Sequence, residues 1–256
     1  MPFITLTSDL GERDHYVAAV KGALYSACPD IRIVDISHQI SHFDIAHAAF
    51  VLKNAYHHFP DGSIHLVSVE STDKADARIL LVRKNRHFFV AYDNGIVSLL
   101  FDDGPDDIFH ILREEGQAGT FPFREIMVEI ACKLVNGSTA EALGVRVSEY
   151  EERQKPQPVL NGNSLRGSIL YFDHYGNAMT NISRTLFEEI IGDKRFSIAF
   201  KNNETVRNIS RSYNEVPEGE KLCIFNSEGY LEIAINKGQA RQLFGLKIGD
   251  LIQIEF

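Results

Sequence analysis

FITLTSDLGERDHYVAAVKGALYSA, residues 3–27, decides the class of fold. Residues 3–7 are a short run of apolar, β-branched and aromatic side chains, which favours a strand. After a polar loop, residues 16–27 place Val17 and Leu24 on one stripe at helical spacing. A strand followed directly by an amphipathic helix is the repeating unit of α/β folds.

The same alternation continues through the first half of the chain. Residues 31–36 and 63–69 have the composition of strands, and residues 45–56 and 124–135 have helical spacing. Residues 78–92 resemble a hairpin, with two apolar runs around a short polar turn. These patterns predict an α/β layer with a mostly parallel sheet.

The composition changes after residue 149. EYEERQKPQP, residues 149–158, is polar, charged and proline-bearing, as interdomain linkers are. Short strands separated by turn residues follow it, which is typical of a small all-β domain. We therefore predict an α/β domain over residues 1–150, a linker over residues 151–163 and a β domain over residues 164–256.

The overall composition argues against several classes of protein. The 256 residues include 35 acidic and 26 basic side chains, which give a net charge of −9, and no basic face typical of a nucleic-acid binder is visible. No apolar stretch reaches the ~18–20 residues of a membrane span. The first residues also lack the pattern of a secretory leader. We therefore expect a cytoplasmic protein that binds neither nucleic acid nor membrane.

The cysteines and histidines show no metal-binding pattern. Cys28, Cys132 and Cys223 are far apart and form no CxxC pair, so we expect separate, buried thiols in a reducing compartment. No HExxH segment occurs, and we predict no metal site. His38 is expected to be a partly exposed loop residue. The absence of GxGxxG and GxxxxGK[ST] segments argues against a site for NAD or a nucleoside triphosphate.

Three polar stretches are candidates for a binding site. DLGERD, residues 9–14, follows the first strand, at the edge where open α/β sheets bind ligands. Its carboxylates suit hydroxyl or cationic groups, but capping of the next helix explains them equally well. YFDHYGNAMTN, residues 171–181, offers a carboxylate, a ring and an amide, or simply a turn at Gly176 and Asn177. NSEGYLEIA, residues 226–234, indicates either a plain turn or a contact to the edge of a base.

In this order, the three stretches resemble the SAM hydroxide adenosyltransferase family, which also includes fluorinase and chlorinase. The resemblance extends to IVDISHQISHFDIAHAAFVLKNAYHHFPDGSIHLVSV at residues 33–69 and to AYDNGIVS at residues 91–98. It implies a Rossmann-like N-terminal α/β domain with a mostly parallel sheet and a small C-terminal β-barrel. It also implies a homotrimer, with sites between the N-terminal domain of one subunit and the C-terminal domain of the next.

The resemblance further implies a ligand and a reaction. The ligand is S-adenosylmethionine, which acts as the substrate, and no separate cofactor is expected. A nucleophile attacks C5′ of the ribose, and in the hydrolytic members water releases adenosine and methionine.

The family's binding positions map onto residues of this chain. Asp9 would hold the ribose hydroxyls, and Asp14 and Asp173 would lie near the methionine end, where a carboxylate can bind the ammonium group. Phe43 would lie against the ribose. The remaining positions are Phe121 and Tyr175 beside the adenine, Asn177 and Ser227 at its edge, and Asp73 in the loop after the third strand.

The family's catalytic positions are altered. The DPGVGTxRR segment of the hydrolytic members reads ESTDKADAR at residues 70–78. Glu70 therefore replaces the aspartate and Ala77 the first arginine, while Arg78 matches the second. Pro122 replaces the histidine of the FHGRD segment. Glu70 and Arg78 remain the candidate catalytic residues, and losing a general acid–base group typically costs ~10²–10⁴-fold in rate.

Three functions are compatible with these residues. The first is a divergent SAM hydrolase, supported by the retained binding positions. The second is a catalytically silent homologue that binds SAM or adenosine, supported by Glu70, Ala77 and Pro122 at the altered positions. The third is adenosyl transfer to another nucleophile such as halide, which ranks last because Ser71 and Thr72 are only a faint trace of a halide pocket.

Overall fold

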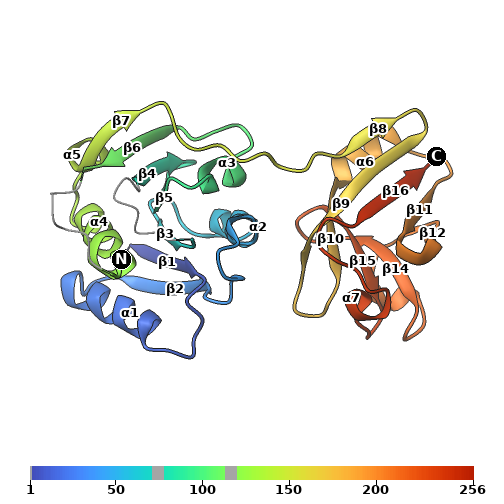
Figure 1. Ribbon diagram of the computed structural model, residues 1–256, viewed down its shortest axis with the longest axis horizontal. Coiled ribbons are helices and arrows are strands. Elements are labelled where there is room, and N and C mark those ends of the chain that lie inside the picture. Colours follow the sequence, from blue (N-terminus) through green and yellow to red (C-terminus); the bar gives the residue numbers. More distant parts are fainter. Residues whose placement is uncertain (1, 71–77, 113–119) are drawn as a thin grey trace. The chain divides into compact units, whose positions relative to one another are not determined.

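The structure is a computed structural model that describes residues 2–70, 78–112 and 120–256, with residue 203 described by its backbone (Figure 1). The chain divides into two compact units, Met1–Gln154 and Lys155–Phe256. The first unit is mixed α/β and the second is mainly β, and each contains one sheet. Among the helices in these ranges, none combines the length and the apolar character needed to cross a bilayer.

A seven-stranded sheet with the order β2-β1-β3-β5-β4-β6-β7 forms the centre of the first unit. The pairs along β2-β1-β3-β5 are parallel, and the pairs along β5-β4-β6-β7 are antiparallel. The prediction of a mostly parallel sheet therefore holds for one half only. Asn85 and Arg86 explain the change, because both have positive φ angles (51° and 65°) and close a tight hairpin that makes its two strands antiparallel. The strands are β1 (Phe3–Ser8), β2 (Arg32–Ser37), β3 (Ile64–Ser68), β4 (Ile79–Lys84), β5 (His87–Tyr92), β6 (Asp107–Ile111) and β7 (Gly144–Val147).

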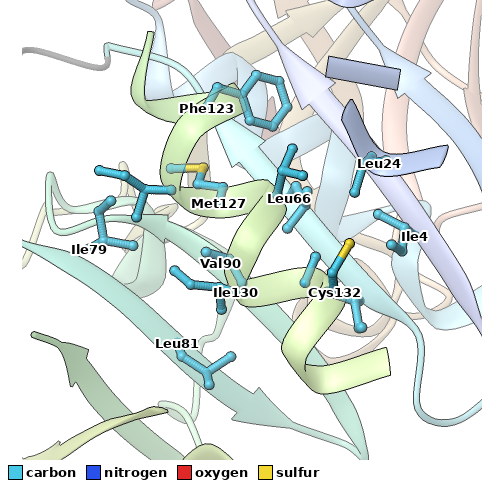
Figure 2. Packing of buried hydrophobic residues seen from close by; sticks show 14 of the residues in the cluster. Ile4, Leu24, Leu66, Ile79, Leu81, Val90, Phe123, Met127, Ile130 and Cys132 are labelled. Carbon is cyan, nitrogen blue, oxygen red and sulfur yellow. The ribbon is translucent and has the colours of Figure 1, made fainter. Parts of the chain in front are cut away.

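Helices cover both faces of this sheet, and each face has its own apolar core. On one face Ile4 and Leu66 pack with Leu24 of α1 and Ile130 of α4, as Figure 2 shows. On the other face Leu52 of α2 belongs to a second cluster. Because β1 and β3 are covered on both sides, their ends are the places where polar side chains reach a surface. The helical segments are α1 (Tyr16–Ala27), α2 (Ile45–Lys53), η1 (Tyr56–His58), α3 (Ile96–Leu100), η2 (Phe123–Met127), α4 (Val128–Val135) and α5 (Ala140–Leu143).

Two of the three cysteines are joined. Cys28, which ends α1, forms a disulfide with Cys132 of α4, whose side chain Figure 2 shows in the core. The expectation of three separate thiols is therefore wrong for this pair, although both side chains are buried as predicted. The two residues are 104 positions apart, and only the packing of α1 and α4 on the same face of the sheet brings them together. Cys223 is buried and free.

The second unit contains a nine-stranded, barrel-like sheet. Its order is β12-β11-β16-β9-β10-β15-β14-β13, and β8 pairs with β9 beside this path. All neighbouring pairs are antiparallel except β13 and β14, and hairpins join β8 to β9, β9 to β10, β11 to β12 and β14 to β15. The elements are β8 (Val159–Asn161), β9 (Ser164–Phe172), β10 (Ala178–Ser183), α6 (Arg184–Ile190), β11 (Ser197–Phe200), η3 (Lys201–Asn203), β12 (Glu204–Val206), β13 (Ile209–Ser210), η4 (Tyr213–Glu215), β14 (Lys221–Phe225), β15 (Tyr230–Ile235), α7 (Ala240–Leu243) and β16 (Leu251–Glu255).

Candidate functional site

Carboxylates follow three neighbouring parallel strands of the first unit. Asp9 comes directly after β1, Glu70 follows β3, and Asp93 follows β5. Because these strands are parallel, their carboxyl ends meet at one edge of the sheet, which is where open α/β sheets bind ligands. The fold therefore gathers three acidic residues at one edge, two of which the sequence analysis singled out.

Asp9 and Phe43 are brought together directly. The backbone N–H of Phe43 donates a hydrogen bond to Oδ2 of Asp9 (2.9 Å). Phe43 has a φ angle of 62°, a left-handed conformation that costs a residue other than glycine about 1–3 kcal/mol. Its ring is 71% exposed, so burial of the side chain does not offset this conformational cost. Local strain around an exposed aromatic ring is a feature of ligand-binding loops.

Phe121 belongs to a small aromatic group that begins one residue after Asp14. Asp14 is exposed in the loop before α1, and the next residue, His15, stacks on Tyr16 with ring centroids 4.4 Å apart. The Tyr16 ring meets the ring of Phe121 edge to face at 5.4 Å. The guanidinium of Arg124 lies 5.7 Å from the centre of the Phe121 ring. The predicted positions of Asp14 and Phe121 thus belong to one region of the first unit.

His38 is not the partly exposed loop residue that the sequence predicts. Its side chain is buried, with 2% exposure, and its Nδ1 lies 2.7 Å from Oγ of Ser8 at the end of β1. Its Nε2 lies 3.1 Å from Oδ1 of Asp35 in β2. The prediction is wrong because β1 and β2 are parallel neighbours, so the loop after β2 folds back over the end of β1.

Arg78, a candidate catalytic residue, is paired with a buried carboxylate. Its guanidinium forms an ion pair with Asp93, whose side chain is only 4% exposed. The other oxygen of Asp93 accepts a hydrogen bond from the backbone N–H of Glu151 (2.7 Å). Arg78 therefore stabilises the fold, since a buried carboxylate without its ion-pair partner would lower the free energy of unfolding.

The altered catalytic positions fall partly within the described residues. Glu70 is half-buried and has a φ angle of 50°, which turns the chain sharply after β3. Pro122 is buried at the start of η2 and offers neither a proton donor nor a proton acceptor on its side chain. Asp73 and Ala77 lie outside the described residues.

In the second unit, Asp173 and Asn177 form a closed turn between β9 and β10. The carboxylate of Asp173 accepts hydrogen bonds from the backbone N–H of Asn177 (2.8 Å) and from its side-chain amide (3.0 Å). Asn177 is buried, whereas the ring of Tyr175 at the tip of the turn is 72% exposed. Gly176 allows the turn with a φ angle of 80°. The predicted hairpin is therefore present, and it presents an acid and an aromatic ring.

Ser227 lies in a different turn of the second unit. It belongs to the turn between β14 and β15, where the side chain of Asn226 accepts the backbone N–H groups of Glu228 (3.1 Å) and Tyr230 (3.0 Å). β10 and β15 are antiparallel, with Ala178 opposite Ile233. The residue before β10 and the turn before β15 therefore lie toward opposite ends of this strand pair.

Glu232, which is not among the residues predicted from the sequence, interacts with residues of both turns, namely Asn226 and Asp173. It is in β15, it is 1% exposed, and its Oε1 accepts a hydrogen bond from the hydroxyl of Tyr213 (2.7 Å). Burial raises the pKa of Glu232; the hydrogen bond from Tyr213 partly opposes this rise, and the charge of Asp173 adds to it. An acidic residue inside the apolar run YLEIAI was the signal that could have revealed it.

Both units match models of one protein family. The model of the SAM hydroxide adenosyltransferase N-terminal domain matches residues 4–144, and that of the C-terminal domain matches residues 167–253. The chain belongs to the SAM hydroxide adenosyltransferase family. Its sequence is 31% identical to that of the (R)-S-adenosyl-L-methionine hydrolase of Thermus thermophilus, over 94% of this chain and 95% of that protein.

Other relatives of this adenosyltransferase-family chain cover almost its whole length. The (R)-S-adenosyl-L-methionine hydrolase of Methanocaldococcus jannaschii is 27% identical, with 99% of this chain and 96% of that protein covered. The fluorinase of Nocardia brasiliensis is 25% identical, with 99% and 97% covered. The crystal structure of an uncharacterized conserved protein from Thermotoga maritima has a TM-score of 0.88, with 29% identity and full coverage of both chains.

Proposed function

We propose that this protein binds S-adenosylmethionine and hydrolyses it to adenosine and methionine. Two relatives that carry the name (R)-S-adenosyl-L-methionine hydrolase and span nearly the whole chain support this proposal. The observation that carries it is the state of Asp9. Its Oδ2 is held by the N–H of Phe43, while its Oδ1 accepts no hydrogen bond from the residues that the structure describes. A fixed carboxylate with one open oxygen, beside an exposed ring, suits a ribose hydroxyl.

The ligand would be shared between units of neighbouring subunits. The first unit, as a Rossmann-like domain, would supply Asp9, Asp14, Phe43 and Phe121, and the barrel of the next subunit in a homotrimer would supply the others. In that barrel Asp173 would hold the ammonium group, as a charge-assisted contact. The remaining contacts from the barrel would come from Tyr175, Asn177 and Ser227.

The hydrolysis is a displacement at C5′ of the ribose. A water oxygen forms the new bond to C5′ while the bond from C5′ to the sulfonium sulfur breaks, and its electron pair neutralises the sulfur. The water loses one proton, for which Glu70, at the edge beside Asp9, is the candidate base. The products are adenosine and methionine, with one proton released. Asp73 would act on the ligand from the same loop.

A second function is favoured by two observations at the altered positions. Arg78 is engaged by Asp93, and Pro122 is buried without a titratable group. If no other group replaces the lost arginine and histidine, the protein binds SAM or adenosine without turnover. The two functions share one binding site and differ only in the chemical step.

The experiment measures binding and turnover separately. Purified protein is titrated with adenosine and with SAM by calorimetry, and SAM is then incubated at high protein concentration while adenosine is quantified by chromatography. Hydrolysis predicts adenosine above the rate in buffer, and Glu70→Gln should lower that rate by about 10²–10⁴-fold without weakening binding. Binding without adenosine establishes the silent homologue. Absence of binding to both ligands rejects the proposal.

A further inference from the structure

A chain of hydrogen bonds runs beneath Asp9 and joins four segments of the first unit. Ser8 at the end of β1 contacts Nδ1 of His38 (2.7 Å), and Nε2 of His38 contacts Oδ1 of Asp35 in β2 (3.1 Å). Lys21 of α1 donates to Oδ2 of Asp35 (2.5 Å). The hydroxyl end of this chain is fully buried, and the lysine end reaches the surface.

The partners determine the direction of each hydrogen bond. Burial alone would raise the pKa of Asp35, but hydrogen bonds from Lys21 and His38 outweigh burial and lower the pKa. Asp35 is therefore an ionised acceptor, and Nε2 of His38 must carry the proton that points at it. In the neutral ring Nδ1 then accepts the proton of the Ser8 hydroxyl.

The serine, histidine and aspartate do not form a nucleophilic triad. The residue Ser8 has no exposed surface, and His38 is 2% exposed, so no substrate atom can approach the hydroxyl. The set instead links the segments that carry the binding residues. This excludes a role in covalent catalysis and leaves a role in positioning.

His38 forms hydrogen bonds with the chain on both sides of Asp9, one through its ring and one through its backbone carbonyl. Its ring holds Ser8, the residue directly before Asp9. Its backbone carbonyl accepts a hydrogen bond from the N–H of Gly11, two residues after Asp9 (2.8 Å). The carboxylate of Asp9 in turn holds the N–H of Phe43, in the same loop as His38. The two loops are thus fastened at three points around one carboxylate.

We propose that His38 is a positioning residue that holds the Asp9 carboxylate in the geometry that binds the ribose hydroxyls of the ligand. This inference rests on the proposed function, because it requires an adenosyl ligand at Asp9. Removal of the imidazole frees the Ser8 end of the 8–11 segment and leaves only the backbone hydrogen bond from Gly11 to residue 38, so Oδ1 of Asp9 no longer has one fixed position. The loss should therefore concern the contact with the hydroxyls and no other part of the ligand.

The experiment compares adenosine with 2′,3′-dideoxyadenosine, which lacks the two hydroxyls. In the wild type, calorimetry should show adenosine binding about 10- to 100-fold more tightly, the range expected for hydrogen bonds to a charged acceptor. His38→Ala and Asp9→Asn should each reduce this preference to about threefold or less, within the size of one weak hydrogen bond. Affinity for dideoxyadenosine should stay unchanged in both. His38→Asn places an amide near the position of Nδ1 and should restore part of the preference.

Two further variants keep the result interpretable. His58→Asn changes an exposed histidine of η1 and should leave both affinities as in the wild type. Ser8→Ala removes the same hydrogen bond with a smaller change and replaces His38→Ala if that variant fails to fold, as judged by circular dichroism. The inference is overturned if His38→Ala or Ser8→Ala weakens the binding of adenosine and of dideoxyadenosine equally, or leaves the preference for adenosine unchanged. If the wild type binds neither adenosine nor SAM, the proposed function falls together with it.

Discussion

His65 makes the first unit sensitive to acid. The side chain lies in β3 with no exposed surface, and its Nδ1 is 2.7 Å from Oγ1 of Thr5. Its Nε2 is 3.1 Å from Nδ1 of His87, and its ring stacks on Phe89 at 4.7 Å. Burial, with a smaller effect from His87, lowers the pKa of His65 from 6.5 to about 3. The folded protein therefore keeps this ring neutral at pH values where the unfolded chain protonates it.

The sign and size of the effect follow from this difference. The unfolded chain takes up the proton near pH 6.5 and the folded protein only near pH 3, so stability is complete above pH 6.5 and falls as the pH drops toward 3. Each pH unit in this window costs about 1.4 kcal/mol. Between pH 7.5 and 4.5 the expected loss is about 3 kcal/mol from His65 alone. Burial also lowers the pKa of His87, which adds to the loss.

Urea unfolding at pH 7.5 and pH 4.5 measures this loss. The variant His65→Gln cannot titrate, so its free energy of unfolding should fall by about 3 kcal/mol less than that of the wild type over the same interval. His58→Gln alters an exposed histidine nearby and serves as the matched control. The titratable neighbour of His65 is His87, which in turn interacts with Asp61, Arg86 and His57, and both proteins retain all four residues. Equal losses in wild type and His65→Gln would refute the reasoning.

Three other perturbations test the structure. Arg78→Ala removes one partner of a buried carboxylate that keeps its bond from the Glu151 N–H, and it should cost about 1–3 kcal/mol in urea unfolding, with partial recovery in Arg78→Lys; lost turnover at unchanged stability would instead assign the residue to catalysis. In denatured, unreduced protein a thiol reagent should count one cysteine, and after reduction three; three before reduction would contradict the link between Cys28 and Cys132. Tyr213→Phe removes the donor to a buried carboxyl group and should lower stability by about 1–3 kcal/mol; an unchanged midpoint would show that the bond contributes nothing.

Local patterns predicted the elements that local physics determines. Strand β1 and helix α1 lie where the apolar spacing of residues 3–27 predicts them, and β4 and β5 form the predicted hairpin. Asp9 and Asp173 each follow a strand, as the sequence indicated, because turn residues mark where strands end. Beyond this hairpin, the antiparallel half of the first sheet could not be inferred, since it depends on which strands become neighbours.

The missed features depend on contacts between residues that are not neighbours in the chain. His38 is buried because β1 lies beside β2, and Cys28 meets Cys132 because two helices share one face of the sheet. Arg78 is engaged by Asp93, which belongs to the end of another strand. Periodicity carries no information about such pairings, so sequence patterns could indicate the candidate residues but not their partners.

The backbone of Phe43 has a consequence for how this loop can change. Glycine adopts a φ angle of 62° without strain, whereas a bulky side chain at this angle makes folding less favourable. A Phe43→Gly protein should therefore melt no earlier than the original while losing its exposed ring. Selection for folding alone would remove the phenylalanine, and the ligand contact proposed for its ring would account for its presence.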